Sequence, residues 1–189
     1  ILDGKILSQQ VEAELKVRVD ALLAQGHVPG LCVILVGEDP ASQLYVGNKE
    51  KACLRLGIAS QTVRMPADIT QEQLEAEIAR ANADPSIHGL LVQFPLPLHL
   101  SASRAQALIL PEKDADGLHD VNTGKMMRGE KAPVACTPKG ALYMLKSANI
   151  PIDGKHAVVV GRSNIVGRPM AMLLLRENAT VTICHSHTQ

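Results

Sequence analysis

The sequence predicts an α/β fold of two domains, each built on a parallel sheet. Short apolar runs of strand length alternate along the chain with stretches of helical periodicity, which is the order that builds parallel sheets. Near the carboxyl end, the apolar run Ala157–Val160 leads through a glycine turn into a second apolar stretch, Met170–Leu175, of helical length. A strand, a glycine turn and a helix in this order begin a nucleotide-binding, Rossmann-like domain.

The first elements are a helix, a strand and a second helix. Apolar residues at helical spacing predict a helix over Ser8–Ala24, and Gly26 ends it. The continuous apolar run Leu31–Val36 predicts a buried strand. After a Gly-Glu-Asp-Pro turn, the segment Ala41–Leu56 is expected to be helical, with Gly57 as its stop.

The next elements repeat this alternation. Gln61–Arg64 is expected to form a short strand, and the capping-box pattern that begins at Thr70 predicts a helix as far as Asn82. His88–Gln93 predicts another buried strand, and Ser101–Leu110 a helix.

The second half begins with a segment that is expected to be mostly loop, residues 111–131, because it contains three glycines. Thr137 and Pro138 are expected to cap and open a helix that runs through Ser147. The remaining elements form a β-α-β unit: the strand Ala157–Val160, the helix that begins near Gly167, and the strand Ala179–Cys184.

Composition excludes several classes of partner. The 189 residues include 19 Lys and Arg and 19 Asp and Glu, so the net charge gives no basis for nonspecific nucleic-acid binding. No Trp is present, and no apolar run approaches a membrane span. We therefore expect neither nucleic acid nor membrane as a partner. The cysteines are scattered singly, which is typical of reduced core residues in a cytoplasmic protein: Cys32, Cys53, Cys136 and Cys184.

The glycine turn has the spacing Gly161-x-Ser163-x-x-x-Gly167. Glycine allows the backbone to approach a phosphate closely, and the free N–H groups of the first helical turn face the anion. Since the spacing departs from Gly-x-Gly-x-x-Gly, an ordinary strand-to-helix turn is the competing interpretation.

The end of the following strand predicts which dinucleotide binds. An acidic residue there would bond the ribose 2′-hydroxyl of NAD, but the chain has Cys-His-Ser-His-Thr at residues 184–188. Arg162 and Ser186, with His185 as a further candidate, are able to receive a 2′-phosphate through charge-assisted hydrogen bonds. The predicted cofactor is therefore NADP. No Cys or carboxylate cluster joins His185 and His187, so we expect no metal.

Tyr45 and Lys49 are four residues apart on one predicted helix, so they share a face. No carboxylate at helical spacing pairs with Lys49 on that face. The plainer interpretation is a solvated lysine beside a half-buried tyrosine. The functional one is a ring that stacks on a flat heterocycle while a desolvated lysine acts as acid or base.

Two further polar positions are candidates for ligand contact. Gln93 follows a buried strand, and the carboxyl ends of parallel strands are where open α/β sheets bind ligands. Asp114 and Asp116 precede Gly117, but the other oxygen ligands of a calcium loop do not follow. The pattern agrees better with a carboxylate that binds the N–H groups of a guanidine-like ligand edge, or with one that caps a backbone turn. For Gln93, a strand-terminating polar residue without function is the alternative.

Together these segments resemble the bifunctional methylenetetrahydrofolate dehydrogenase/methenyltetrahydrofolate cyclohydrolase family of one-carbon metabolism. The matching segments are DGK at 3–5, VGEDPASQLYVGNKEKAC at 36–53, GLLVQFPLP at 89–97, PEKDADGLH at 111–119, CTPKG at 136–140, VVVGRSNIVGRPMAMLL at 158–174 and ATVTICHSHT at 179–188. Phe94 replaces the family's usual Leu, and Ala115 its usual Val. The family's PGGVGPMT segment and its final helix have no counterpart in these residues.

The resemblance implies roles for individual residues. Tyr45 would stack on the folate ring system, and Lys49 would activate water at the methenyl carbon. Gln93 would hold Lys49 and tune its protonation, and Asp116 would bind the N–H edge of the pterin. The residues implied to bind NADP are Gly161, Arg162, Ser163 and Ser186.

The resemblance also implies an organisation for the protein. Residues 1–137 would form the folate-binding catalytic domain, and residues 138–189 the start of the NADP-binding domain. Both chain ends are expected to be cut, and a homodimer that binds tetrahydrofolate derivatives is expected from the family. The open alternatives are a monofunctional dehydrogenase relative, a different NADP oxidoreductase on the same scaffold, and a catalytically incomplete folate-binding fragment.

Overall fold

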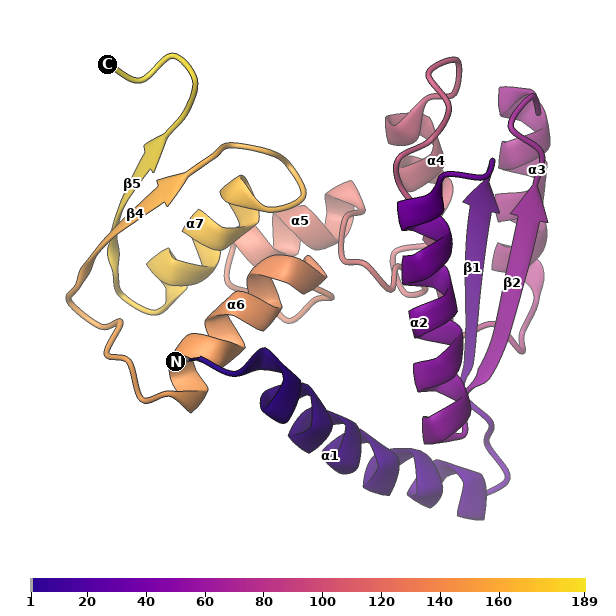
Figure 1. Ribbon diagram of the computed structural model, residues 1–189, viewed down its shortest axis with the longest axis horizontal. Coiled ribbons are helices and arrows are strands. Elements are labelled where there is room, and N and C mark those ends of the chain that lie inside the picture. The colour runs from indigo at the N-terminus through magenta and orange to yellow at the C-terminus, as the bar shows by residue number, and fades with distance from the viewer. Residues whose placement is uncertain (1) are drawn as a thin grey trace. The chain divides into compact units, whose positions relative to one another are not determined.

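The structure is a computed structural model that describes residues 2–189, and Figure 1 shows its helices and strands. Contacts divide the chain into two compact units. The first unit is Ser8–Ala115, and the second unit is Asp116–Gln189 together with the N-terminal segment that ends at Leu7. The expected domain border near Thr137 stays a prediction. Within residues 2–189, no helix combines the length and the apolar character needed to cross a bilayer.

The first unit confirms the predicted alternation of strands and helices. A long helix, α1 (Gly4–Ala24), leads into it. The elements that follow are β1 (Gly30–Val36), α2 (Pro40–Leu56), β2 (Ala59–Met65), α3 (Gln71–Ala83), β3 (Gly89–Val92) and α4 (Ala102–Leu108). The strands form one parallel sheet in the order β2-β1-β3.

The two faces of this sheet carry separate parts of the core because successive strand residues point to opposite faces. On one face, Ile34 and Leu90 pack with Ile78 of α3 and with other fully buried apolar side chains. On the other face, Val33 and Leu35 pack with Val46 of α2. Helices therefore cover both faces, as a parallel sheet requires.

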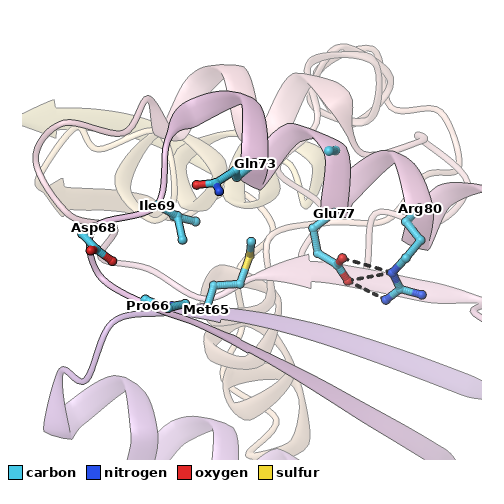
Figure 2. Close-up of a pocket in the computed structure, with 8 residues that line it drawn as sticks. Met65, Pro66, Asp68, Ile69, Gln73, Glu77 and Arg80 are labelled. Atoms are coloured by element: carbon cyan, nitrogen blue, oxygen red, sulfur yellow. Dashed lines mark hydrogen bonds and ion pairs between the residues drawn. The ribbon is translucent and has the colours of Figure 1, made fainter.

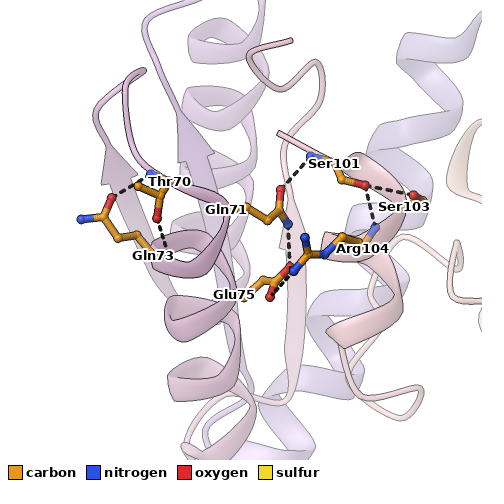
Figure 3. Close-up of polar contacts among 7 residues, drawn as sticks. All are labelled: Thr70, Gln71, Gln73, Glu75, Ser101, Ser103 and Arg104. Carbon is orange, nitrogen blue, oxygen red and sulfur yellow. Dashed lines mark hydrogen bonds and ion pairs between the residues drawn. The ribbon is translucent and has the colours of Figure 1, made fainter. Parts of the chain in front are cut away.

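The N-terminus of α3 confirms the predicted capping box. The Thr70 hydroxyl accepts from the Gln73 N–H, and the Gln73 side chain accepts from the Thr70 N–H. Figure 3 shows that α3 is also tied to α4 by polar contacts. Gln71 Oε1 accepts from the Ser101 N–H at 2.7 Å, and Arg104 pairs with Glu75 at 2.8 Å.

The second unit holds α5 (Asp120–Met127), α6 (Cys136–Ser147), β4 (His156–Val160), α7 (Gly167–Arg176) and β5 (Thr180–Cys184). The strands β4 and β5 pair in parallel, which confirms the predicted β-α-β unit. Neither strand has a fully buried residue: Val158 is 56% exposed and Val160 is 85% exposed.

Two local expectations were wrong in the second unit. Helix α5 lies inside the segment that was expected to be loop. A histidine ring caps it, since His119 Nδ1 accepts from the Val121 N–H at 3.1 Å, and the buried Asn122 and Met126 hold its inner face. Packing has overridden the low helix propensity of its glycine. Thr137 does not cap α6, which already begins at Cys136 and has no side-chain cap.

Candidate active site

Tyr45 and Lys49 lie on α2, whose start is well defined. The N-cap Asp39 accepts from the Ser42 N–H at 2.8 Å, and Pro40 occupies the first helical position. Hydrogen bonds from the backbone N–H and the side chain of Ser42 lower the pKa of the Asp39 carboxyl. The four-residue spacing puts Lys49 Nζ 6.0 Å from the centroid of the Tyr45 ring, a cation–π distance. The Tyr45 ring is 60% exposed, so a flat ligand has access to it.

Gln93 meets Lys49 from the end of β3. Lys49 Nζ donates to Gln93 Oε1 at 2.9 Å, although the residues are 44 positions apart in the chain. Gln93 Nε2 donates to the carbonyl of Phe94 at 2.9 Å, which fixes the orientation of the amide. The Gln93 N–H continues the sheet ladder to Ile34 at 2.8 Å. The amide oxygen is therefore held toward the lysine by both its backbone and its own side chain.

Ser42 joins this arrangement, and the sequence prediction did not include it. Its side chain is buried at 2% exposure, and its hydroxyl donates to the Phe94 carbonyl at 3.4 Å. The start of α2 is thus linked to the loop after β3. The Asp-Pro-x-Ser pattern at the predicted helix start was the available signal, but it indicates a cap and not a long-range contact.

The electrostatic surroundings of Lys49 match the expectation from the helix pattern. Within the first unit, Lys49 has no carboxylate at ion-pair distance. The neighbouring Glu50 is directed elsewhere: its Oε1 accepts from the Thr62 hydroxyl at 2.5 Å and from Arg64 at 3.4 Å. The contact partner of Lys49 within the first unit is therefore a neutral amide.

Asp114 and Asp116 belong to different units. Asp114 is 4% exposed and sits in a segment that bridges β3, where the Leu90 N–H donates to the Lys113 carbonyl at 2.7 Å. Lys113 Nζ donates in turn to the carbonyls of Asn82 and Asp84, both at 2.7 Å. This segment is structural. Asp116 begins the second unit.

Asp116 is positioned by a turn that needs glycine. Gly117 has a φ of +69°, and a Cβ there would lie 2.4 Å from the carbonyl carbon of Val134. No other residue fits between the chain segments, so the turn after Asp116 is closely defined. Cys136 Sγ lies 4.0 Å from Asp116 Oδ1.

The glycine turn of the second unit also depends on close backbone approach. A Cβ on Gly167 would lie 2.2 Å from the carbonyl oxygen of Gly161, so the start of α7 is pressed against the end of β4. The Gly161 N–H donates to the Cys184 carbonyl at 2.8 Å, which extends the pairing of β4 and β5. Both glycines therefore shape the turn.

Ser163 bonds the first N–H groups of α7. Its Oγ accepts from the N–H groups of Val166 at 3.2 Å and Gly167 at 3.3 Å, and its carbonyl accepts from Arg168 at 3.0 Å. Because Pro169 has no N–H, the donors of the first turn of α7 are already taken. The expectation of free helix N–H groups facing an anion was wrong. Arg162 and Ser186 have exposed side chains in the same unit.

Neither cavity described within the units includes a predicted site residue. Figure 2 shows a cavity of about 730 Å³ in the first unit, between the end of β2 and α3, next to the Glu77–Arg80 ion pair. A second cavity of about 380 Å³ lies in the second unit, with an apolar lining from α6, β4 and α7.

Comparison with known proteins decides the family. The catalytic-domain model of tetrahydrofolate dehydrogenase/cyclohydrolase matches residues 2–116, and the NAD(P)-binding-domain model of the same family matches residues 135–189. The chain belongs to the tetrahydrofolate dehydrogenase/cyclohydrolase family.

Individual relatives agree with this assignment. The bifunctional protein FolD of Streptococcus pyogenes is 53% identical over 190 residues, which cover all of this chain and 67% of that protein. The solved FolD structure from Campylobacter jejuni has 46% identity and a TM-score of 0.97, and the alignment covers 100% of this chain and 67% of that one. The Trypanosoma brucei FolD structure, a complex with NADP and an inhibitor, has 40% identity and a TM-score of 0.94, with 98% and 64% covered.

Proposed function

We propose that this protein oxidises 5,10-methylenetetrahydrofolate with NADP and hydrolyses the resulting 5,10-methenyltetrahydrofolate to 10-formyltetrahydrofolate. Membership of the dehydrogenase/cyclohydrolase family supports both reactions. The observation that carries the proposal is the hydrogen bond of 2.9 Å between Lys49 Nζ and Gln93 Oε1. It joins two of the family-like segments at the carboxyl end of a parallel strand, where such sheets bind ligands.

Lys49 is proposed as the acid–base group of the hydrolytic step. A neutral amine takes a proton from water as the water oxygen attacks the methenyl carbon. The bond between that carbon and N5 then breaks with its electron pair going to N5, which takes a proton from the protonated Lys49 while the carbinol O–H gives its proton to the amine. The formyl group is left on N10, and Lys49 releases one proton to the solvent. Gln93 Oε1 accepts a hydrogen bond from the amine in either protonation state, so it holds Lys49 throughout the cycle.

Tyr45 and Asp116 are proposed to bind the folate. The exposed Tyr45 ring would stack on the pterin, with Lys49 close to the same face. The carboxylate of Asp116 would accept two N–H groups from the pterin edge, a bidentate contact for which carboxylates are suited. The oxidation step moves a hydride from the methylene bridge and needs little acid–base assistance from these residues.

The second unit is proposed to bind NADP, which supplies the hydride acceptor when bound. Ser163 Oγ already accepts two N–H groups, so its own proton remains available to a phosphate oxygen. Gly161 allows close approach of the backbone. Arg162 and Ser186 would receive the 2′-phosphate, and the absence of an acid at residues 184–188 favours that charged group.

We further propose, on the family resemblance, that the protein acts in the cytoplasm as a homodimer and supplies formyl groups for purine biosynthesis. Residues 1–137 and 138–189 would be its catalytic and cofactor domains. Sedimentation of the purified protein would give a dimer mass if the first part of this proposal is correct, and a monomer mass at all concentrations would contradict it.

Two separate assays test the function. The protein is mixed with 5,10-methylenetetrahydrofolate and NADP to follow formation of NADPH, and with 5,10-methenyltetrahydrofolate to follow its hydrolysis. Both activities are expected. Dehydrogenase activity alone would identify a monofunctional relative, and folate binding without either reaction would identify an incomplete fragment. Oxidation of unrelated substrates with no competition by folates would reject the folate assignment.

A further inference from the structure

The segment that follows β5 is closed into a tight turn by its own side chains. The Thr188 N–H donates to the His185 carbonyl at 2.8 Å, and the His185 N–H donates back to the Thr188 hydroxyl at 2.8 Å. A third bond comes from the imidazole, because the His187 N–H donates to His185 Nδ1 at 3.1 Å. Three hydrogen bonds therefore define the backbone of a four-residue segment.

Ser186 is inside this turn. It has an exposed side chain and is flanked on both sides by residues whose backbone N–H groups are bound within the turn. The turn starts where the sheet ends, since the Gly161 N–H is bonded to the Cys184 carbonyl. The backbone that carries the Ser186 side chain is therefore held by the side chains of His185 and Thr188.

We infer that His185 and Thr188 are positioning residues for the preference for NADP over NAD. This inference rests on the proposed function, in which Ser186 receives the 2′-phosphate. His185 would act through its Nδ1, which accepts from the His187 N–H and so holds the turn. An imidazole that accepts at Nδ1 carries its proton on Nε2.

Substitutions in this turn can separate the role of His185 as a hydrogen-bond acceptor from the role of its imidazole ring. An asparagine side chain bonds the backbone N–H two residues further on, the same connection that His185 makes to His187. His185→Asn therefore keeps the hydrogen bond without the ring, and His185→Ala removes both. Thr188→Ser keeps the hydroxyl acceptor, and Thr188→Val removes it. His187→Ala is the matched control, since its ring is no acceptor in the turn.

The experiment measures dissociation constants of NADP and NAD by calorimetry with the purified protein, which does not depend on turnover. His185→Ala and Thr188→Val are expected to weaken NADP about three- to tenfold, the effect of one misplaced hydrogen bond, and to leave NAD unchanged because it lacks the 2′-phosphate. His185→Asn, Thr188→Ser and His187→Ala are expected to keep the parent ratio of the two constants.

Two results would overturn the inference. A His185→Ala variant with the parent ratio would mean that the turn does not set the preference. A His185→Asn variant as weak as His185→Ala would mean that the ring itself contacts the cofactor. Arg162→Ala and Ser186→Ala are measured in parallel: if neither changes the ratio, the proposed phosphate site is wrong, whereas a change there with none at His185 rejects the positioning role alone.

Discussion

The two parallel sheets of this protein differ in how completely they are buried. In the first unit, β1 has six buried residues of seven, and helices cover both faces. In the second unit, β4 alternates between exposed and half-buried residues. The side chains proposed for acid–base chemistry lie on α2 and just after β3, in the unit with the well-packed sheet. Those proposed for the cofactor follow the carboxyl ends of β4 and β5 in the open sheet. A rigid frame suits a reacting group, which needs a fixed geometry.

Charge divides between the units as well. The first unit carries nine Lys and Arg against thirteen Asp and Glu, and the second unit ten against six, so their formal charges are −4 and +4. The neutral total conceals this separation. A basic unit attracts an anionic dinucleotide over several ångströms, which favours its encounter with the second unit. The formal charge of each folded unit therefore says more about its ligands than the formal charge of the whole chain.

The largest expected effect comes from Lys49→Gln. Loss of the acid–base group is expected to reduce methenyl hydrolysis about 10²- to 10⁴-fold, and the affinity for folate is expected to stay within a few-fold of the parent. Hydrolysis rates and folate binding are measured on the same preparation. Lys51→Gln, an exposed position on the same helix, is the matched control and should behave as the parent. Unchanged hydrolysis in Lys49→Gln would remove the lysine from the mechanism.

The contrast in burial is tested by two truncations. Ile34→Ala is expected to lower the free energy of unfolding by about 2–5 kcal/mol, because the fully buried side chain leaves a cavity. Val160→Ala, at an 85% exposed position, is expected to change it by less than about 0.5 kcal/mol. Urea unfolding of the 189-residue chain, followed by circular dichroism, measures both. Equal losses would mean that the open sheet is as well packed as the buried one.

A smaller effect, on dinucleotide binding, is expected from a substitution in the second unit. Arg162→Ala should weaken NADP by about ten- to a hundredfold, the range for loss of hydrogen bonds to a charged group, and should weaken NAD much less. Binding constants for both dinucleotides are compared with those of Arg176→Ala, which changes an arginine at the far end of α7. Equal losses for NADP and NAD would refute the 2′-phosphate contact.

The reactivity of the cysteines tests the difference in burial between the two units with the smallest perturbation, because no residue is replaced. Burial raises the pKa of the Cys32 and Cys53 thiols, both in the first unit. Cys136 is exposed and Cys184 half-buried, both in the second. Because the thiolate is the reactive form, a thiol reagent should modify Cys136 first, faster as pH rises, and should reach Cys32 and Cys53 only in denaturant. Mass spectrometry after proteolysis identifies the labelled sites; early labelling of Cys32 would contradict the buried core.

The fold was predictable where local signals and hydrophobic pattern agree. The strands β1, β3 and β4 were expected from apolar runs, and the capping box at Thr70 was recognised from residue types at fixed spacing. Helix α5 was missed because its cap is a histidine ring and its interior contains glycine. Its stability comes from the burial of Asn122 and Met126, which no local pattern reveals.

For the candidate site, the sequence by itself determined the residue types and their places on elements: Tyr45 and Lys49 on one helix face, Gln93 at a strand end, and a glycine turn followed by no acid. Only the tertiary structure decided which of them meet. The contact of Lys49 with Gln93, and the link from Ser42 to Phe94, join segments 44 and 52 residues apart. The occupation of the helix N–H groups by Ser163 is likewise a matter of backbone geometry. Residue type sets which hydrogen bonds are possible, and the packing of the strands and helices selects the partner.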